Sequence, residues 1–316
     1  MIPTAFRSNV MLATIAACAV LAVLPLVLSN WMIFLIALAL AKGAVVLGVV
    51  MLLRGGLISF GHALYFAIGA YVVGFLSNRF GIGEALIALP LAFAISAAVA
   101  AALGLLLTRF RGIYYAMLSL ALSMVLYTVL IKFYNFSGGS DGISVRGFTL
   151  AGIRPANPGL AQYYLILVVT AGVLYVGARF LASPLGYLMQ AVRYNEIRIE
   201  YLGASTSRAI LASQTLSGAI SGLGGAMVAY LVGQVSPDLA FWVSSGDFVF
   251  VAVLGGTGSV FAPFVGSIAF EFVKNYAVKF SPNTWQLTLG VFLLLVINFQ
   301  PQGLWTLLTR WKAKPK

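Results

Sequence analysis

The sequence predicts an all-α protein, a polytopic bundle of membrane-spanning helices. Of its 316 residues, 61% are hydrophobic and only 8% are charged, and the mean hydropathy is +1.02. A soluble core does not need so apolar a chain, whereas a transmembrane bundle does. The apolar residues also form runs of about 20, the length that crosses a hydrocarbon layer of ~30 Å as a helix. We therefore expect a single transmembrane domain over residues 1–316.

Charges, Gly/Pro clusters and polar dipeptides separate these apolar runs. The runs lie at 10–28, 31–53, 57–77, 85–107, 113–131, 162–181, 209–233, 244–278 and 285–308. Together they predict about eight full spans and one exception. The exception, 244–278, is too long for one span and is interrupted by the glycine-rich sequence 255–259. It predicts a broken or re-entrant helix pair with its turn at membrane depth, where irregular backbone survives only inside protein or beside a water-filled cavity.

The first run contains the one cysteine of the chain. Ile15-Ala16-Ala17-Cys18 resembles the cleavage box of a bacterial lipoprotein. The apolar run continues past Cys18 to Leu28, whereas a cleaved signal gives way to a polar mature start. We therefore expect an uncleaved first span. One cysteine and one histidine also argue against an internal disulfide framework and a protein-built metal site.

The basic residues predict how the bundle is oriented. The net charge is +12, yet Lys and Arg stand singly or in pairs between apolar runs and form no patch interleaved with aromatic residues. That distribution argues against a nucleic-acid partner. With a cytoplasmic amino terminus, twelve of the 19 Lys and Arg residues lie on that side, six on the other, and Lys42 inside a span. Both termini are then cytoplasmic, provided that 244–278 enters and leaves on the outer side.

A polar stretch at 133–161 predicts an external loop. It has turn sequences at 138–142 and at 157–159. No GK[ST] follows the glycines, and the loop has no spaced set of acidic ligands, so we expect turns or partner docking rather than phosphate or calcium binding.

A second polar stretch, Ser183 to Gly203, predicts an amphipathic cytoplasmic helix over 184–202. Ser183 can cap its start, Pro184 suits the first helical position, and Gly203 supplies the stop. One face carries Leu188, Val192, Asn195, Ile199 and Leu202. The pattern alone leaves two interpretations open, a helix that touches a partner and a helix that lies at the lipid headgroups.

Several residues are candidates for a substrate path. The candidate path comprises Lys42, Gly55, Gly56, His62, Gly255 and Gly256. A lipid-facing ammonium at mid-span costs about 3 kcal/mol, so Lys42 should face the bundle interior and pair with Glu271, with Asp247 or with a substrate carboxylate. The alternative is a helix break after Lys42 that lets the side chain snorkel. Glycines can expose backbone groups to a polar solute, or they can serve close packing, as the GxxxG pair Gly218 and Gly222 indicates.

Sequence motifs along most of the chain resemble one family. They are RGGLISFGHALYFAIGAY (54–71), RGIYYAMLSLALS (111–123), GGSDGI (138–143), LSGAISGLGGAM (216–227), VSPD (235–238), VAVLGGTGSVFAPFVGS (251–267) and WQLTLGVFLLLVINFQPQGL (285–304). In this order they resemble the LivM-type permease subunit of bacterial branched-chain amino acid ABC importers. The resemblance implies a multi-helix permease that works with a second, related permease, two cytoplasmic ATP-binding subunits and a periplasmic substrate-binding protein.

The same resemblance assigns the polar helix. Ala191, Arg193, Asn195, Glu196, Leu202 and Gly203 match the family pattern A-x-R-x-N-E-x5-L-G. The resemblance therefore implies that 184–202 is the coupling helix that seats in the ATPase subunit, with Arg193, Asn195, Glu196, Leu202 and Gly203 as its coupling residues. Tyr194 and Arg198-Ile199 depart from the pattern, as does 44–53, where the family usually carries G-L-N and G-Y-T-G.

These observations predict an inner-membrane permease subunit that moves branched-chain or related hydrophobic amino acids inward by alternating access. The chain is not expected to be an enzyme or to bind a cofactor. A permease for urea or short amides is the sibling alternative. A stand-alone secondary carrier would need paired ionisable groups within the membrane, for which Lys42 and Glu271 are the deep candidates. A membrane hydrolase is disfavoured because His62 has no motif serine nearby in sequence and HExxH is missing.

Overall fold

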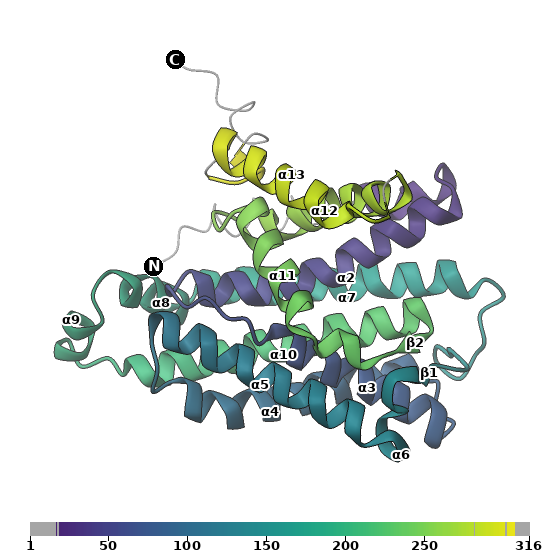
Figure 1. Ribbon diagram of the computed structural model, residues 1–316, viewed down its shortest axis with the longest axis horizontal. Helices are drawn as coiled ribbons and strands as arrows, with labels where there is room; N and C mark the ends of the chain where they lie inside the picture. The colour runs from purple at the N-terminus through teal and green to yellow at the C-terminus, as the bar shows by residue number, and fades with distance from the viewer. Residues whose placement is uncertain (1–16, 18, 281, 301, 307–316) are drawn as a thin grey trace.

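The computed structural model describes residues 17, 19–280, 282–300 and 302–306, which form a helical bundle (Figure 1). Its longer helices are α2 (Asn30–Leu53), α3 (His62–Arg79), α4 (Ala85–Leu107), α5 (Gly112–Lys132), α7 (Pro158–Leu181), α10 (Thr206–Val232), α11 (Trp242–Gly255), α12 (Ala262–Phe280) and α13 (Trp285–Phe299). The shorter elements are η1 (Leu24–Leu26), α6 (Tyr134–Ser137), η2 (Gly139–Asp141), β1 (Ile143–Ser144), α8 (Pro184–Tyr194), α9 (Glu196–Tyr201), β2 (Gln234–Val235) and η3 (Pro237–Ala240).

The helices follow the predicted apolar runs and confirm a helical polytopic membrane protein. Helices α2, α4, α5, α7 and α10 are long and apolar enough to cross a bilayer, and α11 and α13 are shorter apolar helices. In the run 285–308, helix α13 ends at Phe299 and a turn follows near 302. Residues 10–16 and 18 of the first run, 10–28, lie outside the described residues, so the number of spans stays a prediction, as does the fate of Cys18.

Helix α10 lies at the centre of the bundle and packs on α2, α3 and α4. Small residues make these contacts possible. A Cβ on Gly222 would overlap Ser96 of α4, one on Gly225 would overlap the Phe66 carbonyl of α3, and one on Gly218 would overlap Ala100 of α4. The prediction that the GxxxG pair serves close packing is therefore confirmed.

One end of the bundle, called here the β1–β2 end, is covered by the segment 133–157. Strand β1 pairs with β2 in an antiparallel register, Ile143 opposite Val235. Gly138 and Gly142 have φ of 76° and 73°, which confirms the predicted turn. The Glu84 carboxylate accepts hydrogen bonds from the backbone N–H groups of Ala151 and Gly152 at 2.7 and 2.8 Å. These bonds hold the pKa of Glu84 below its usual value and tie the loop to the start of α4.

Helices α11 and α12 form the predicted broken pair, but their turn does not lie at mid-depth. Arg54, which follows α2, donates from Nε and Nη2 to the Thr257 carbonyl at 2.9 and 2.6 Å. The turn is therefore level with the C-terminal end of α2. Helix α11 begins halfway along the bundle instead, where Ser123 in the middle of α5 donates to the Ala240 carbonyl. The physical reason is length, since 14 residues span only about 21 Å.

Candidate functional site: the α8–α9 end

The end opposite the β1–β2 end is formed by α8 and α9, which divide the predicted helix 184–202 in two (Figure 1). Ser183 caps α8 by accepting from the Gly186 N–H at 3.2 Å, as expected. The break falls at Asn195, whose backbone is extended and whose side chain accepts from the Arg198 N–H at 2.9 Å. Asn caps a helix more readily than it continues one. The single continuous helix was therefore a wrong prediction, although Asn195 itself was the available signal.

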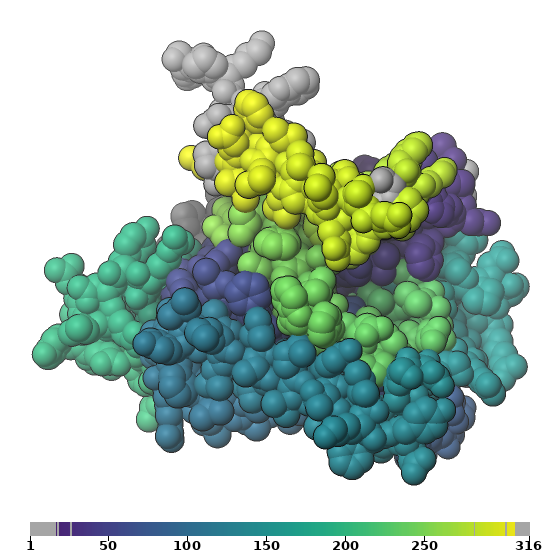
Figure 2. All heavy atoms as spheres, viewed as in Figure 1, coloured from purple at the N-terminus to yellow at the C-terminus, as the bar shows by residue number. Residues whose placement is uncertain are grey.

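The break also ends the predicted apolar stripe. Met189 and Val192 of α8 are buried against the bundle. Beyond them the exposed fractions are 88% for Tyr194, 88% for Tyr201 and 77% for Leu202. Figure 2 shows α8 and α9 protruding from the side of the molecule. Helix α8 is thus seated on the bundle, while α9 and its flanks present an exposed apolar patch of the kind that marks an interaction site.

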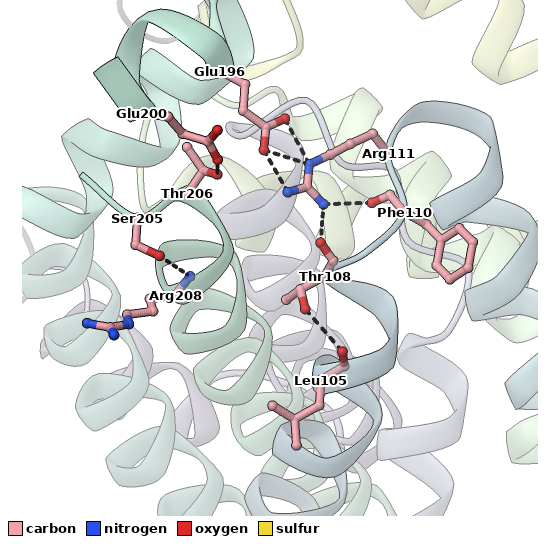
Figure 3. Close-up of polar contacts among 9 residues, drawn as sticks. All are labelled: Leu105, Thr108, Phe110, Arg111, Glu196, Glu200, Ser205, Thr206 and Arg208. Carbon is pink, nitrogen blue, oxygen red and sulfur yellow. Dashed lines mark hydrogen bonds and ion pairs between the residues drawn. The ribbon is translucent and has the colours of Figure 1, made fainter. Parts of the chain in front are cut away.

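Helix α9 is attached to the bundle by a bidentate ion pair between Arg111 and Glu196 (Figure 3). Arg111, at the α4–α5 turn, donates from Nη2 to Glu196 Oε1 at 2.6 Å and from Nε to Glu196 Oε2 at 2.9 Å. The guanidinium is oriented by the carbonyls of Thr108 and Phe110, which accept from Nη1. Arg111 lowers the pKa of the Glu196 carboxyl, chiefly by hydrogen bonding. At the other end of α9, Thr206 of α10 donates to Glu200 Oε1 at 2.6 Å.

Helix α8 is packed against the turn between α2 and α3. A Cβ on Gly55 would overlap Met189 Cε, and one on Gly56, where φ is +75°, would come within 3.3 Å of Arg193 Cγ. The two glycines predicted for a substrate path therefore lie beside a predicted coupling residue. Their smallness lets the backbone of this turn approach α8 closely.

The α2–α3 turn is also joined to the α11–α12 turn, by the hydrogen bonds from Arg54 to the Thr257 carbonyl. Gly256, at φ +90°, has no room for a Cβ beside the Gln302 carbonyl. The Leu304 N–H donates to the Leu254 carbonyl at 2.8 Å. Gly55, Gly56, Gly255 and Gly256 are thus brought to one end of the molecule, whereas Lys42 and His62 are not part of this cluster.

His62 begins α3 inside the bundle and is fully buried. Its Nε2 lies 2.7 Å from Ser217 Oγ of α10. Tyr65, one turn further along α3, accepts a hydrogen bond from Gln214 Nε2 at 2.9 Å. The serine near His62 comes from a distant part of the sequence and could not be found by a local motif. The small polar residues along α10 were the only signal for it.

Lys42 lies within the unbroken helix α2, which contradicts the alternative of a helix break at this residue. Its Nζ is 2.7 Å from Glu271 Oε1 of α12, so the predicted pairing with Glu271 is confirmed. Asp247 of α11, the other proposed partner, pairs instead with Lys274 of α12 at 2.6 Å. The Lys274 pair was missed, because a predicted helix pair does not by itself show which residues of its two helices face each other.

Long apolar helices, a central small-residue helix and an exposed helical segment at one end define a multi-pass membrane protein. The chain belongs to the family described as branched-chain amino acid transport system / permease component, because the model of that family matches residues 31–297. That range extends from the start of α2 nearly to the end of α13. The resemblance found in the motifs is therefore confirmed.

Curated relatives agree with this assignment. The high-affinity branched-chain amino acid transport system permease proteins LivM of Salmonella typhimurium and Escherichia coli are each 30% identical over 272 residues, which cover 79% of this chain. The match spans 64% of the length of each of these two relatives. A probable branched-chain amino acid transport permease protein LivM of Methanocaldococcus jannaschii is 24% identical over 277 residues, 80% of its length. No solved structure matches the chain.

Proposed function

We propose that the chain is the permease subunit of an ABC importer for branched-chain or related hydrophobic amino acids. The observation that carries this proposal is the family match over residues 31–297. The chain acts as a single permease domain over 1–316 and is not itself an enzyme. It moves substrate inward by alternating access, and ATP hydrolysis takes place on partner subunits. Those partners are two cytoplasmic ATP-binding subunits, a second related permease and a periplasmic substrate-binding protein.

The proposed location is the bacterial inner membrane, with both termini and the α8–α9 end in the cytoplasm. The bias of twelve basic residues against six supports this orientation. The contacts at the α8–α9 end support a coupling role. A displacement of α9 would act on the α4–α5 turn through Glu196 and Arg111, and one of α8 would act on the α2–α3 turn through Met189 and Gly55. The predicted coupling residues Asn195, Leu202 and Gly203 cap or follow α9 within the same segment.

Uptake of radiolabelled leucine into proteoliposomes tests the proposal. The vesicles contain this chain with its partner permease and ATP-binding subunits, and the substrate-binding protein is added outside. We expect leucine uptake that requires ATP inside and the binding protein outside. Urea in place of leucine, and a proton or sodium gradient in place of ATP, serve as the two comparison conditions. Uptake of urea but not leucine would replace the substrate class, and gradient-driven uptake without ATP would replace the ABC mechanism with that of a secondary carrier.

A further inference from the structure

Four charged side chains lie where α2, α11 and α12 pack together. Lys42 of α2 is paired with Glu271 of α12 at 2.7 Å, and Asp247 of α11 is paired with Lys274 of α12 at 2.6 Å. Residues three apart on a helix have Cβ atoms about 5–6 Å apart, so Glu271 and Lys274 place the two ion pairs next to each other. We call these four residues the charge quartet. It carries two ammonium and two carboxylate groups and has no net charge.

The quartet is neither sealed inside the bundle nor spread over its surface. The side chains of Lys42, Lys274 and Asp247 are 23%, 25% and 21% exposed, and that of Glu271 is 6% exposed. Lys42 is the one residue between Ala39 and Leu52 of α2 that is not buried. Three of the four side chains are therefore partly exposed at the surface of the described chain, and only the Glu271 carboxylate is closed off.

The lysines keep donors for a further ligand. Among the residues that the structure describes, each of the two ammonium groups donates to a single acceptor, Glu271 Oε1 for Lys42 and Asp247 Oδ2 for Lys274. An ammonium group has three N–H donors. Neither lysine is thus saturated by its partner.

We propose that the charge quartet binds the ammonium and carboxylate groups of a zwitterionic amino acid. The ligand carboxylate accepts from a lysine, and the ligand ammonium donates to Glu271 or Asp247. Because the ligand brings both charges, it exchanges ion-pair partners and leaves no charge unpaired in apolar surroundings. A ligand with only one of the two charges leaves one member of the quartet without compensation. This inference rests on the proposed function and names the residues that bind the α-ammonium and α-carboxylate groups, which all the proposed substrates share.

Two aromatic rings lie beside Lys274, next to the charges. Lys274 Nζ lies 5.7 Å from the centre of the Phe270 ring and 5.1 Å from that of Trp285, which begins α13. Ring faces attract an ammonium group and also pack against hydrocarbon. The site therefore combines recognition of both backbone charges with an apolar wall, which fits a hydrophobic amino acid better than urea.

Saturation-transfer NMR tests the quartet on the detergent-purified complex of this chain with its partner subunits, without the substrate-binding protein. The probes are leucine, 3-methylbutylamine, which lacks the carboxylate, and 4-methylpentanoate, which lacks the ammonium. We expect leucine to bind at least tenfold more tightly than either analogue. Lys274→Met and Asp247→Asn should each weaken leucine binding at least tenfold. Lys279→Met, at the exposed end of the same helix, is the matched control and should bind leucine as the wild type does.

Misfolding of a single variant would not leave the question open. The double variant Asp247→Leu with Lys274→Met removes one ion pair without leaving an uncompensated charge, and its elution profile reports whether the complex is intact. An intact complex that binds leucine as tightly as the wild type would overturn the proposal. Equal binding of leucine and its one-charge analogues to the wild type would also overturn it. Leucine uptake by the proteoliposomes is measured separately, so the quartet can fail while the transport function stands.

Discussion

Helix α10 and the α8–α9 segment are neighbours in sequence, yet they occupy opposite environments. In the most apolar part of α10, 72% of the residues are buried, and its glycines admit α3 and α4 to backbone contact. The segment before it has no buried residue in α9 and exposes Tyr194 and Tyr201 almost completely. Substitutions in α10 should therefore impair folding, while substitutions in α9 should impair the binding of a partner subunit.

The largest effect should come from bulk in α10. A Cβ on Gly225 would overlap the Phe66 carbonyl, so Gly225→Val forces α3 and α10 apart. Overpacking of this kind costs about 3 kcal/mol. We expect little folded protein by fluorescence-detected size-exclusion chromatography of detergent extracts. Gly172→Val is the matched control, because Gly172 on α7 is exposed and has no atom within 4 Å of an added Cβ. Equal yields of the two variants would contradict the picture of α10 as the packing centre.

An intermediate effect should come from the exposed aromatic residues at the α8–α9 end. Reversing the charges of Arg193 and Glu196 is a poor test of docking, since Glu196 is already bound to Arg111 of the same chain. Tyr194→Ser with Tyr201→Ser removes two side chains that are each 88% exposed, without touching a contact of the fold. If this patch seats in the ATPase, we expect leucine-stimulated ATP hydrolysis and uptake to fall about tenfold, the equivalent of ~1.4 kcal/mol of docking free energy.

The control for the tyrosine variant is Phe280→Ser. It changes a ring that is 80% exposed at the C-terminal end of α12. It should leave hydrolysis and uptake unchanged. The yield of folded permease should be the same for both variants. Unchanged hydrolysis and uptake in the tyrosine variant would leave α9 as an anchor at the lipid headgroups. The contrast between a folding role for α10 and a docking role for α9 would then be wrong.

The same contrast explains what could be predicted from the sequence. The positions of α2, α4, α5, α7 and α10 follow from apolar runs, because a bilayer requires long uninterrupted helices. The need of Lys42 for a partner followed from the cost of an unpaired charge in such a helix. The structure selects Glu271 from the three partners that were predicted. Outside the apolar helices the constraint is weaker, and the local preference of Asn195 for a helix cap divided a segment whose periodicity suggested one helix.

Contacts between distant segments could not be predicted from one sequence. Nothing near Arg54 in the chain indicates that it caps the turn at Thr257, and nothing near Arg111 points to Glu196. Both contacts arise because helix ends from different parts of the chain meet at one end of the bundle. The glycine pairs at 55–56 and 255–256 show the same limit. Glycine at these positions indicated either close backbone packing or a substrate path. Only the structure shows which residues the glycines pack against.

The smallest effect should be the pH dependence of the Arg111–Glu196 pair. The pKa of Glu196 is lowered in the folded protein, so its contribution to stability is present above the unfolded value of about 4.3 and is lost as pH falls through the lower folded value. The pair lies near the surface and should contribute at most about 1 kcal/mol. We expect the thermal unfolding temperature of the detergent-solubilised wild type to lie above that of Glu196→Gln by a small, constant difference between pH 5 and 8, because Glu196 stays ionised in this range. This difference in unfolding temperature should shrink below about pH 4.

Glu200→Gln is the control variant, since Glu200 accepts a hydrogen bond from Thr206 and its substitution removes no ion pair among the described residues. A wild-type advantage over Glu196→Gln that persists unchanged to pH 3 would show that α9 is held by packing rather than by this charge.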